Sequence, residues 1–169
     1  MYETESELEE MQRLLDASNE RAGGHLRSVF GAEKRLSARQ ISHYLRGVKQ
    51  VAAAATNKKG EPRVAPIDAV LFHGKFFLST DATSLRARSL SRNPAISLTY
   101  FEGADPMIVV NGRAAFVRKD DPNFEALDAQ WKKAYGTSIL ELGDTVLFIR
   151  VDAVHMLAFA MHPERFLDS

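Results

Sequence analysis

Three arginines stand close together in the segment TSLRARSLSRNP, which runs from Thr83 to Pro94 between two apolar stretches. A helix that starts near Thr83 or Ser84 would place Arg86 in its first turn, where unpaired backbone amides favour an anion. A cation there opposes the helix dipole, and a bound phosphate would explain its presence. The alternative is a solvated helix face with local ion pairs, and the spacing alone does not choose between the two.

The other two arginines of the segment have different expected roles. Arg88 is a candidate second ligand for the same anion, whereas Arg92 lies near the helix C-terminus, where a cation suits the dipole without any ligand. The preceding apolar strand ends on the hydroxyls of Ser79 and Thr80, beside the arginines. These hydroxyls favour the phosphate interpretation.

Residues 63–67, with the sequence RVAPI, form a second candidate binding segment. Pro66 inside a strand-like run indicates a sheet edge or an interrupted ladder, because proline has no amide hydrogen to donate. Backbone groups left free there could hydrogen-bond a planar polar ligand. The segment therefore predicts recognition by the main chain rather than by side chains.

The elements that must position these residues are mostly strands. Short apolar and alternating runs are separated by turns rich in glycine and asparagine, which predicts antiparallel hairpins. The expected strands cover residues 51–56, 63–72, 75–80, 95–101, 107–117 and 145–154, with 155–159 continuing after a bend. Six or seven such strands predict a mainly β fold, a closed or nearly closed β-barrel with flanking helices.

Helices are expected before, between and after these strands. Apolar spacing predicts a helix over residues 6–19, and a capping box at Ser37 begins another that ends near Arg46. Residues 120–122, Asp-Asp-Pro, look like the start of a later helix with a capping acid.

The chain shows no linker and no internal repeat that would divide it. We expect residues 1–48 to form an N-terminal helical extension and residues 49–169 to form the barrel domain. Asn111-Gly112, inside the long strand over 107–117, indicates a bulge or bend.

Composition excludes several classes of protein. The chain has no cysteine, so disulfides, thiolate catalysis and cysteine-ligated metal sites are absent. Lys+Arg and Asp+Glu are both 22, giving a net charge of +0, which argues against a dedicated nucleic-acid binder. No apolar run reaches the roughly 18 residues of a membrane span, and the acidic N-terminus is not typical of a targeting signal. We expect a cytoplasmic protein without a membrane or nucleic-acid partner.

Common catalytic motifs are absent from the sequence. It has no phosphate-binding or dinucleotide-binding glycine motif and no nucleophile elbow. The five histidines stand at no metal-binding spacing, so each is better explained as structural. No metal site and no catalytic residue are assigned.

Taken together, the segments resemble the pyridoxamine 5′-phosphate oxidase-like superfamily, the flavin-binding split barrels. The resemblance rests on VAAAAT, GEPRVAPI, FFLST, SLRARSLSRNP and VVNGRA, and it is best over residues 50–117. It implies a six- to seven-stranded split β-barrel, a homodimer with FMN at the subunit interface, and a small-molecule substrate.

The resemblance also implies which residues bind the cofactor. The basic residue matching Arg86 holds the flavin phosphate with help from nearby hydroxyls, and Arg88 matches a commonly basic position. The segment matching residues 63–67 follows the ribityl chain and the isoalloxazine ring, mainly through backbone contacts. The implied set is Arg63, Val64, Ala65, Pro66, Ile67, Ser79, Thr80, Ser84, Leu85, Arg86, Arg88 and Met107.

The chain departs from the true pyridoxamine phosphate oxidases at three places. Asp68 stands where those enzymes carry a substrate-binding lysine, and Met107 replaces a glutamine that approaches the flavin ring. The tail over residues 161–166 lacks their R-x-H element. These departures argue against vitamin B6 oxidation and favour the flavin and deazaflavin reductase branch.

We therefore expect an FMN-dependent oxidoreductase that passes hydride or electrons from a reduced nicotinamide or deazaflavin to an unidentified organic acceptor. The flavin would supply the redox chemistry and the protein its orientation. Two alternatives remain open. One is an F420-dependent reductase on the same fold, and the other is a non-catalytic haem or flavin binding protein in which His155 or His162 ligates the haem.

Overall fold

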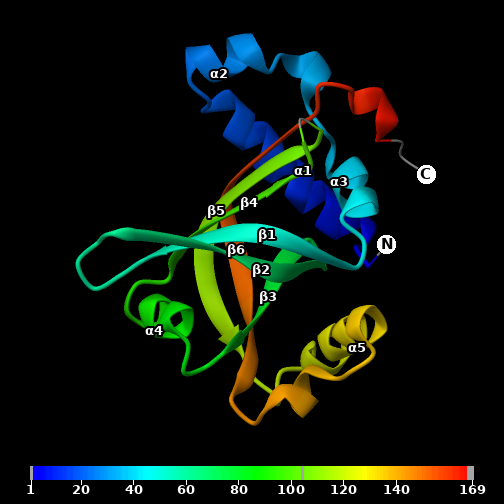
Figure 1. Ribbon diagram of the computed structural model, residues 1–169. Coiled ribbons are helices and arrows are strands. Elements are labelled where there is room, and N and C mark those ends of the chain that lie inside the picture. The colour runs from blue at the N-terminus through cyan, green and yellow to red at the C-terminus, as the bar shows by residue number, and fades with distance from the viewer. Residues whose placement is uncertain (1, 104, 167–169) are drawn as a thin grey trace.

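Six antiparallel strands close into one barrel in the order β1-β2-β3-β6-β5-β4 (Figure 1). The computed structural model describes residues 2–103 and 105–166. The strands are β1 (Val48–Thr56), β2 (Pro62–Phe72), β3 (Lys75–Asp81), β4 (Ala95–Phe101), β5 (Met107–Val117) and β6 (Val146–Phe159). The flanking helices are α1 (Glu5–Glu20), α2 (Gly24–Val29), α3 (Ala38–Tyr44), α4 (Leu85–Arg92) and α5 (Phe124–Tyr135). The predicted mainly β barrel with flanking helices is confirmed.

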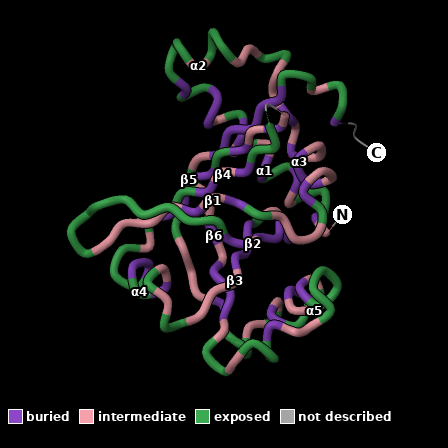
Figure 2. Tube along the Cα trace, viewed as in Figure 1, coloured by how far each residue is buried: buried purple, intermediate pink, exposed green. Residues whose placement is uncertain are grey.

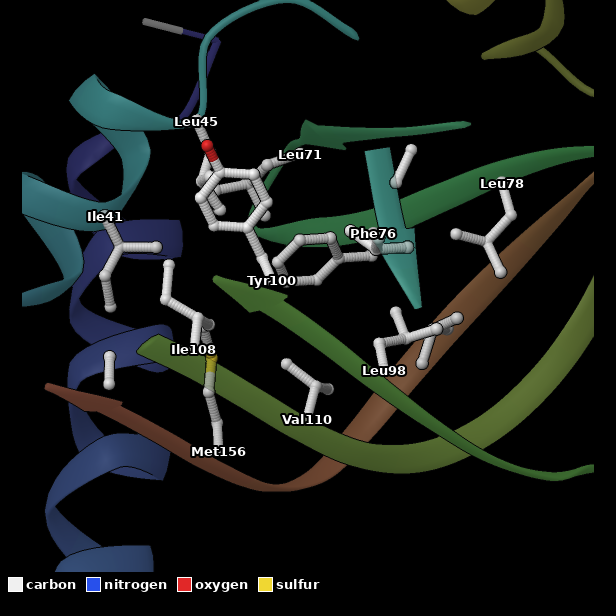
Figure 3. Packing of buried hydrophobic residues seen from close by; sticks show 14 of the residues in the cluster. Ile41, Leu45, Leu71, Phe76, Leu78, Leu98, Tyr100, Ile108, Val110 and Met156 are labelled. Atoms are coloured by element: carbon white, nitrogen blue, oxygen red, sulfur yellow. The ribbon is translucent and has the colours of Figure 1, made fainter. Parts of the chain in front are cut away.

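Every second side chain of each strand fills the barrel interior, because successive side chains of a strand point to opposite faces of the sheet. On β4, Ile96, Leu98 and Tyr100 are buried, while Ser97 and Phe101 between and beyond them are exposed. Figure 2 shows buried and exposed residues mixed in this way along the barrel strands. Figure 3 shows side chains of several strands and helices packed into one core: Ile41, Leu45, Leu71, Phe76, Leu78, Leu98, Tyr100, Ile108, Val110 and Met156. Burying each large apolar side chain contributes about 1.5–3 kcal/mol.

The N-terminal helices share this core. Leu8, Met11 and Leu15 of α1, together with Ile41 of α3 and Leu45 at the C-cap of α3, belong to the same buried cluster as the barrel side chains. Both helices begin at the capping boxes of Thr4 and Ser37, in which a hydroxyl accepts an amide hydrogen from the first turn. The helical segment is thus a packed part of the protein, and β1 begins directly after it.

The bulge predicted at Asn111-Gly112 is present between β5 and β6. Asn111 pairs with His155, but Gly112 pairs with Ala153, so Val154 is an extra residue on β6. A Cβ atom at position 112 would lie 2.5 Å from the carbonyl oxygen of Asp152. Any residue other than glycine would therefore clash with the backbone of β6 at this position. The bulge lets β6 continue to Phe159, so the barrel has six strands rather than seven.

The helix predicted from residues 120–122 begins later, at Phe124. Asp121 accepts a hydrogen bond from the amide of Asn123 at 2.9 Å, which stabilises a turn before the helix. The N-cap is Asn123, which makes no side-chain capping bond. The predicted boundary is wrong because an aspartate can support a local turn as readily as a helix cap.

A hydrogen bond between Glu7 of α1 and His73 of the β2–β3 turn, which is an ion pair when His73 is protonated, ties the N-terminal helix to the barrel. Glu7 Oε1 lies 3.1 Å from Nδ1 of His73. Burial acts to raise the pKa of Glu7, but hydrogen bonds from Thr4 and His73 and the charge of His73 outweigh it, so the pKa is lowered. A carboxyl whose pKa is lowered by folding stabilises the protein above its unfolded pKa and loses that contribution as the pH falls.

We expect Glu7→Gln to lower the free energy of unfolding at pH 7 by up to about 1 kcal/mol, because the pair is partly exposed and glutamine preserves the capping box. The loss should shrink near pH 3, where the wild-type carboxyl is itself becoming protonated. Urea unfolding at both pH values measures the difference. Glu9→Gln, which removes the exposed Glu9–Arg13 pair of the same helix, is the control. An equal loss from Glu7→Gln at both pH values would contradict the assignment.

Candidate functional site

A cavity of about 440 Å³ opens between the outer half of β2 and the start of α4. Its floor comes from β1, whose Ala53 and Ala55 pair with Ala65 and Arg63 of β2. Alanine side chains at these two positions leave the space above the strands open. The residues that line the cavity are Ala53, Ala55, Arg63, Val64, Ala65, Ser84, Leu85, Arg86 and Ser89.

One edge of β2 is unpaired beside this cavity. β2 pairs with β1 from Pro62 to Val70, but with β3 only from Ala69 to Phe72. Pro66 lies in the stretch of β2 that does not pair with β3, which suits a residue that has no amide hydrogen to donate to a neighbouring strand. The predicted interruption of the ladder is confirmed, and it leaves backbone groups near the cavity for a ligand.

Arg86 is the central charged group of the cavity. Its guanidinium is half-buried, and Nη2 donates a hydrogen bond to the carbonyl of Ala65 across the cavity at 3.3 Å. Burial lowers the pKa of Arg86. In the described part of the chain this guanidinium forms no ion pair with a carboxylate, so most of its five N–H donors remain for a ligand.

The start of α4 adds further donors to the same place. Ser84 is the N-cap, and its hydroxyl accepts from the amide of Ala87 at 3.0 Å. Its carbonyl accepts from the amide of Arg88 at 3.1 Å. The amides of Leu85 and Arg86 have no helical partner, as at every helix N-terminus, and they lie beside the guanidinium. An anion at this point would meet a cation, amides and a favourable helix dipole.

The structure brings together half of the residues predicted to bind the cofactor. Six of them line the cavity: Arg63, Val64, Ala65, Ser84, Leu85 and Arg86. Thr80 is linked to it because its hydroxyl lies 3.1 Å from that of Ser84. Arg88 lies on an adjoining groove.

The remaining predicted residues lie outside the cavity lining. Ser79 lies on β3 opposite Phe148 of β6, and Ile67 is buried in the barrel core. Pro66 lies just beyond the lined segment of β2. Met107 begins β5, where it pairs with Phe101 and Phe159, on a different part of the barrel.

Three further residues line the cavity that the sequence did not predict for the site: Ala53, Ala55 and Ser89. The two alanines are visible in the sequence as part of the run VAAAAT, but their place in the cavity depends on the register of β1 against β2. Ser89 lies one helical turn after Arg86, a spacing that could have indicated it.

Neither histidine considered as a haem ligand lies at the cavity. His155 is on β6 opposite Asn111, and its buried Nδ1 has no hydrogen-bond partner among the described residues. His162 is exposed and lies 3.2 Å from Glu164. Across the described residues, no group of three or more potential ligand side chains is placed to hold a metal ion. No helix in the same part of the chain is both long and apolar enough to cross a membrane.

Comparison with known proteins identifies the fold. Solved structures with the same fold include a conserved hypothetical protein from Mycobacterium tuberculosis, with 18% identity, a TM-score of 0.66 and coverage of 80% of this chain and 92% of that one. The haem storage protein HutZ from Vibrio cholerae shows 17% identity, a TM-score of 0.60 and coverage of 73% and 94%. An F420 reductase shows 16% identity, a TM-score of 0.55 and coverage of 69% and 94%. A search of curated proteins found no match.

These identities establish a shared fold and leave the activity of this chain open. The family assignment comes from a model of the pyridoxamine 5′-phosphate oxidase family, which matches residues 37–158. That range contains all six strands except the last residue of β6, and it includes the cavity with Arg86. The chain belongs to the pyridoxamine 5′-phosphate oxidase family.

Proposed function

We propose that the protein is an FMN-binding oxidoreductase that holds the flavin in the cavity between β2 and α4. The observation that carries this proposal is the half-buried guanidinium of Arg86, which has no carboxylate partner among the residues that the structure describes and lies beside free helix amides. Taking even part of a charge out of water without a counter-ion is unfavourable, so the arrangement is best explained by a bound anion. The phosphate of FMN has the charge and the acceptor oxygens that this site fits.

The rest of the cavity suits the remainder of the cofactor. The uncovered edge of β2 over residues 63–67 offers backbone donors and acceptors, and Ala53 and Ala55 leave room for a flat ring. When bound, the flavin supplies the hydride or electron transfer between a reduced nicotinamide or deazaflavin donor and an organic acceptor. The chain orients the cofactor, holds its phosphate and excludes water from one side of it.

We also propose that the protein functions as a homodimer with the cofactor at the subunit interface. Phe101 of β4 lies opposite Met107 of β5, and Val109 lies opposite Thr99, so three apolar side chains share the outer face of these strands. Phe101 is 62% exposed and Val109 37%, and neighbouring exposed apolar side chains of this kind indicate an interaction surface. In the dimer, this face would be covered and Met107 could reach the cofactor of the partner subunit.

Phe101→Glu is expected to shift the protein from dimer to monomer at micromolar concentration, because it places a charge in the covered apolar face. Analytical ultracentrifugation measures the change. Leu142→Glu, at an apolar residue that is 68% exposed on the turn before β6, is the control and should remain dimeric. A wild-type protein that is monomeric and still binds flavin would contradict the interface site.

The visible absorption spectrum of the purified protein tests the cofactor class. FMN predicts flavin bands, whereas a haem protein would show a Soret band, and F420 would produce its own absorption only after it is added. A Soret band from stoichiometric haem would contradict the proposal. The haem alternative also has less structural support, since neither His155 nor His162 lines the cavity.

A further inference from the structure

A row of four side chains crosses the outer face of the barrel at the end where the β4–β5 turn lies. Phe101 of β4 pairs with Met107 of β5, and Met107 pairs with Phe159 of β6. Arg35, in the connection between α2 and α3, forms a bridge with Phe159 and extends the row by one residue. Residues that pair directly across antiparallel segments point to the same face. The N-terminal segment therefore adds a charged residue to the face that the proposed dimer covers.

The backbone directs the side chain of Arg35 onto this outer face. Hydrogen bonds of 3.0 and 2.9 Å join the residues that flank Arg35 to the residues that flank Phe159. This is the pattern of a non-hydrogen-bonded pair, in which the two side chains approach most closely. Leu36 is buried in the barrel core, so the side chain before it in the extended segment points away from the core.

Aromatic side chains form an apolar surface next to Arg35. The ring of Phe30 stacks on that of Phe159, with a centroid distance of 4.5 Å and an interplanar angle of 18°. Phe159 is buried, whereas Phe101 at the other end of the row is exposed. Figure 1 shows α2 beyond this end of the barrel, with the last residues of β6 running toward the segment that follows α2.

The guanidinium of Arg35 is partly buried without a counter-charge. Its Nε is buried and has no hydrogen-bond partner in the part of the chain that the structure describes. None of the ion pairs formed within residues 2–103 and 105–166 includes Arg35. A charged donor that is shielded from water and unpaired is unfavourable. Because the guanidinium fork matches a carboxylate or a phosphate, the arrangement favours an anion supplied by another molecule.

We infer that Arg35 binds the acid group, a carboxylate or a phosphate, of a substrate held against the cofactor of the partner subunit. The inference rests on the proposed function, in which Met107 reaches that cofactor across the dimer interface. Two strand spacings separate Arg35 from Met107, which is about 10 Å. A substrate with an apolar ring spans this distance, with its reacting part near Met107 and its acid group at Arg35. The site therefore selects an acidic organic acceptor over a neutral one.

Binding of small ring compounds to the FMN-loaded protein tests this selection. Benzoate, phenylphosphonate and benzamide carry the same ring but differ in charge and in the kind of anionic group. They are titrated into the wild type, Arg35→Ala, Arg35→Lys and Arg27→Ala, and calorimetry gives each Kd. Arg27 is the matched control, since it is an exposed arginine of α2 that donates to the carbonyl of Glu20 at 3.3 Å. Thermal unfolding establishes that each variant is folded.

The wild type is expected to bind benzoate or phenylphosphonate about tenfold more tightly than benzamide, because the bonds from Arg35 to an anion are charge-assisted. The preferred anion identifies the acid group as a carboxylate or a phosphate. Arg35→Ala should lose this preference, and Arg35→Lys should keep part of it, because lysine retains the charge without the fork. Arg27→Ala should match the wild type.

A mixed dimer tests whether Arg35 acts across the interface. Subunits carrying Arg86→Ala and Arg35→Ala are combined under two affinity tags. If Arg35 serves the partner's site, both defects fall in one site and the other site is intact. The mixed dimer should then bind the preferred anion with the wild-type Kd at about half of the wild-type stoichiometry. If Arg35 served its own chain, each site would carry one defect and no site would show the wild-type Kd.

Several results would overturn the inference while leaving the proposed function intact. One is that the charged rings bind to the FMN-loaded wild type no better than benzamide. Others are an unchanged preference in Arg35→Ala, an equal loss in Arg27→Ala, and a mixed dimer without a wild-type site. A wild-type protein that does not bind FMN would instead overturn the proposed function, and the role of Arg35 with it.

Discussion

Replacing Arg86 by alanine is expected to weaken FMN binding by about 1.5–3 kcal/mol, or roughly 10- to 150-fold in Kd. The loss arises because the guanidinium is the charged donor that faces the cavity from α4, and its hydrogen bonds to a phosphate are charge-assisted. Arg86→Lys should lose less, because it keeps the charge but not the planar fork of donors. Quenching of FMN fluorescence on titration measures each Kd.

Arg92→Ala is the matched control for this prediction, because it removes the same side chain from the other end of α4. Its effect on FMN should be within about twofold, since Arg92 lies outside the cavity lining. Arg86 also donates to the carbonyl of Ala65, so thermal unfolding must show that the alanine variant remains folded. Equal FMN affinities for Arg86→Ala and the wild type would show that Arg86 does not bind the phosphate.

Phe148→Ala is expected to lower the free energy of unfolding by about 3–5 kcal/mol, the largest effect among the substitutions proposed for this protein. Phe148 of β6 is 0% exposed, and its ring packs against Phe124 and Trp131 of α5 at centroid distances of 5.1 and 4.8 Å. These three residues belong to a second cluster of buried apolar residues, which also contains Val70 and Phe72 of β2. The cluster therefore fixes α5 to the strand that leads to the cavity.

Urea unfolding of Phe148→Ala and of Val154→Ala measures this difference. Val154 lies on the same strand but is 57% exposed at the bulge, so its replacement should change stability by less than about 0.5 kcal/mol. A loss below about 1 kcal/mol for Phe148→Ala would show that α5 does not depend on this contact.

Local patterns in the sequence were sufficient to predict the strands and the start of α4. The alternation of apolar residues marks β4 and β5, and the hydroxyl of Ser84 marks the N-cap that places Arg86 in the first turn. Both features depend on residues within a few positions of one another. For the same reason the bulge at Asn111-Gly112 was predictable, since a glycine inside a strand indicates it directly.

Features that depend on long-range pairing were not predictable in the same way. Ala53 and Ala55 line the cavity because of their register against β2, which the local pattern of β1 does not determine. Met107 was assigned to the site by family resemblance, yet it lies away from the cavity of its own chain. Its role therefore depends on the proposed dimer, whose geometry a single chain does not contain.

A crystal structure of the protein with FMN tests the central claim most directly. We expect the phosphate within hydrogen-bond distance of the Arg86 guanidinium and the first amides of α4, with the ring along residues 63–67 of β2. The same structure should show Met107 of a second subunit approaching that ring. FMN bound elsewhere, or no FMN in the cavity at saturating concentration, would contradict the assignment of this site.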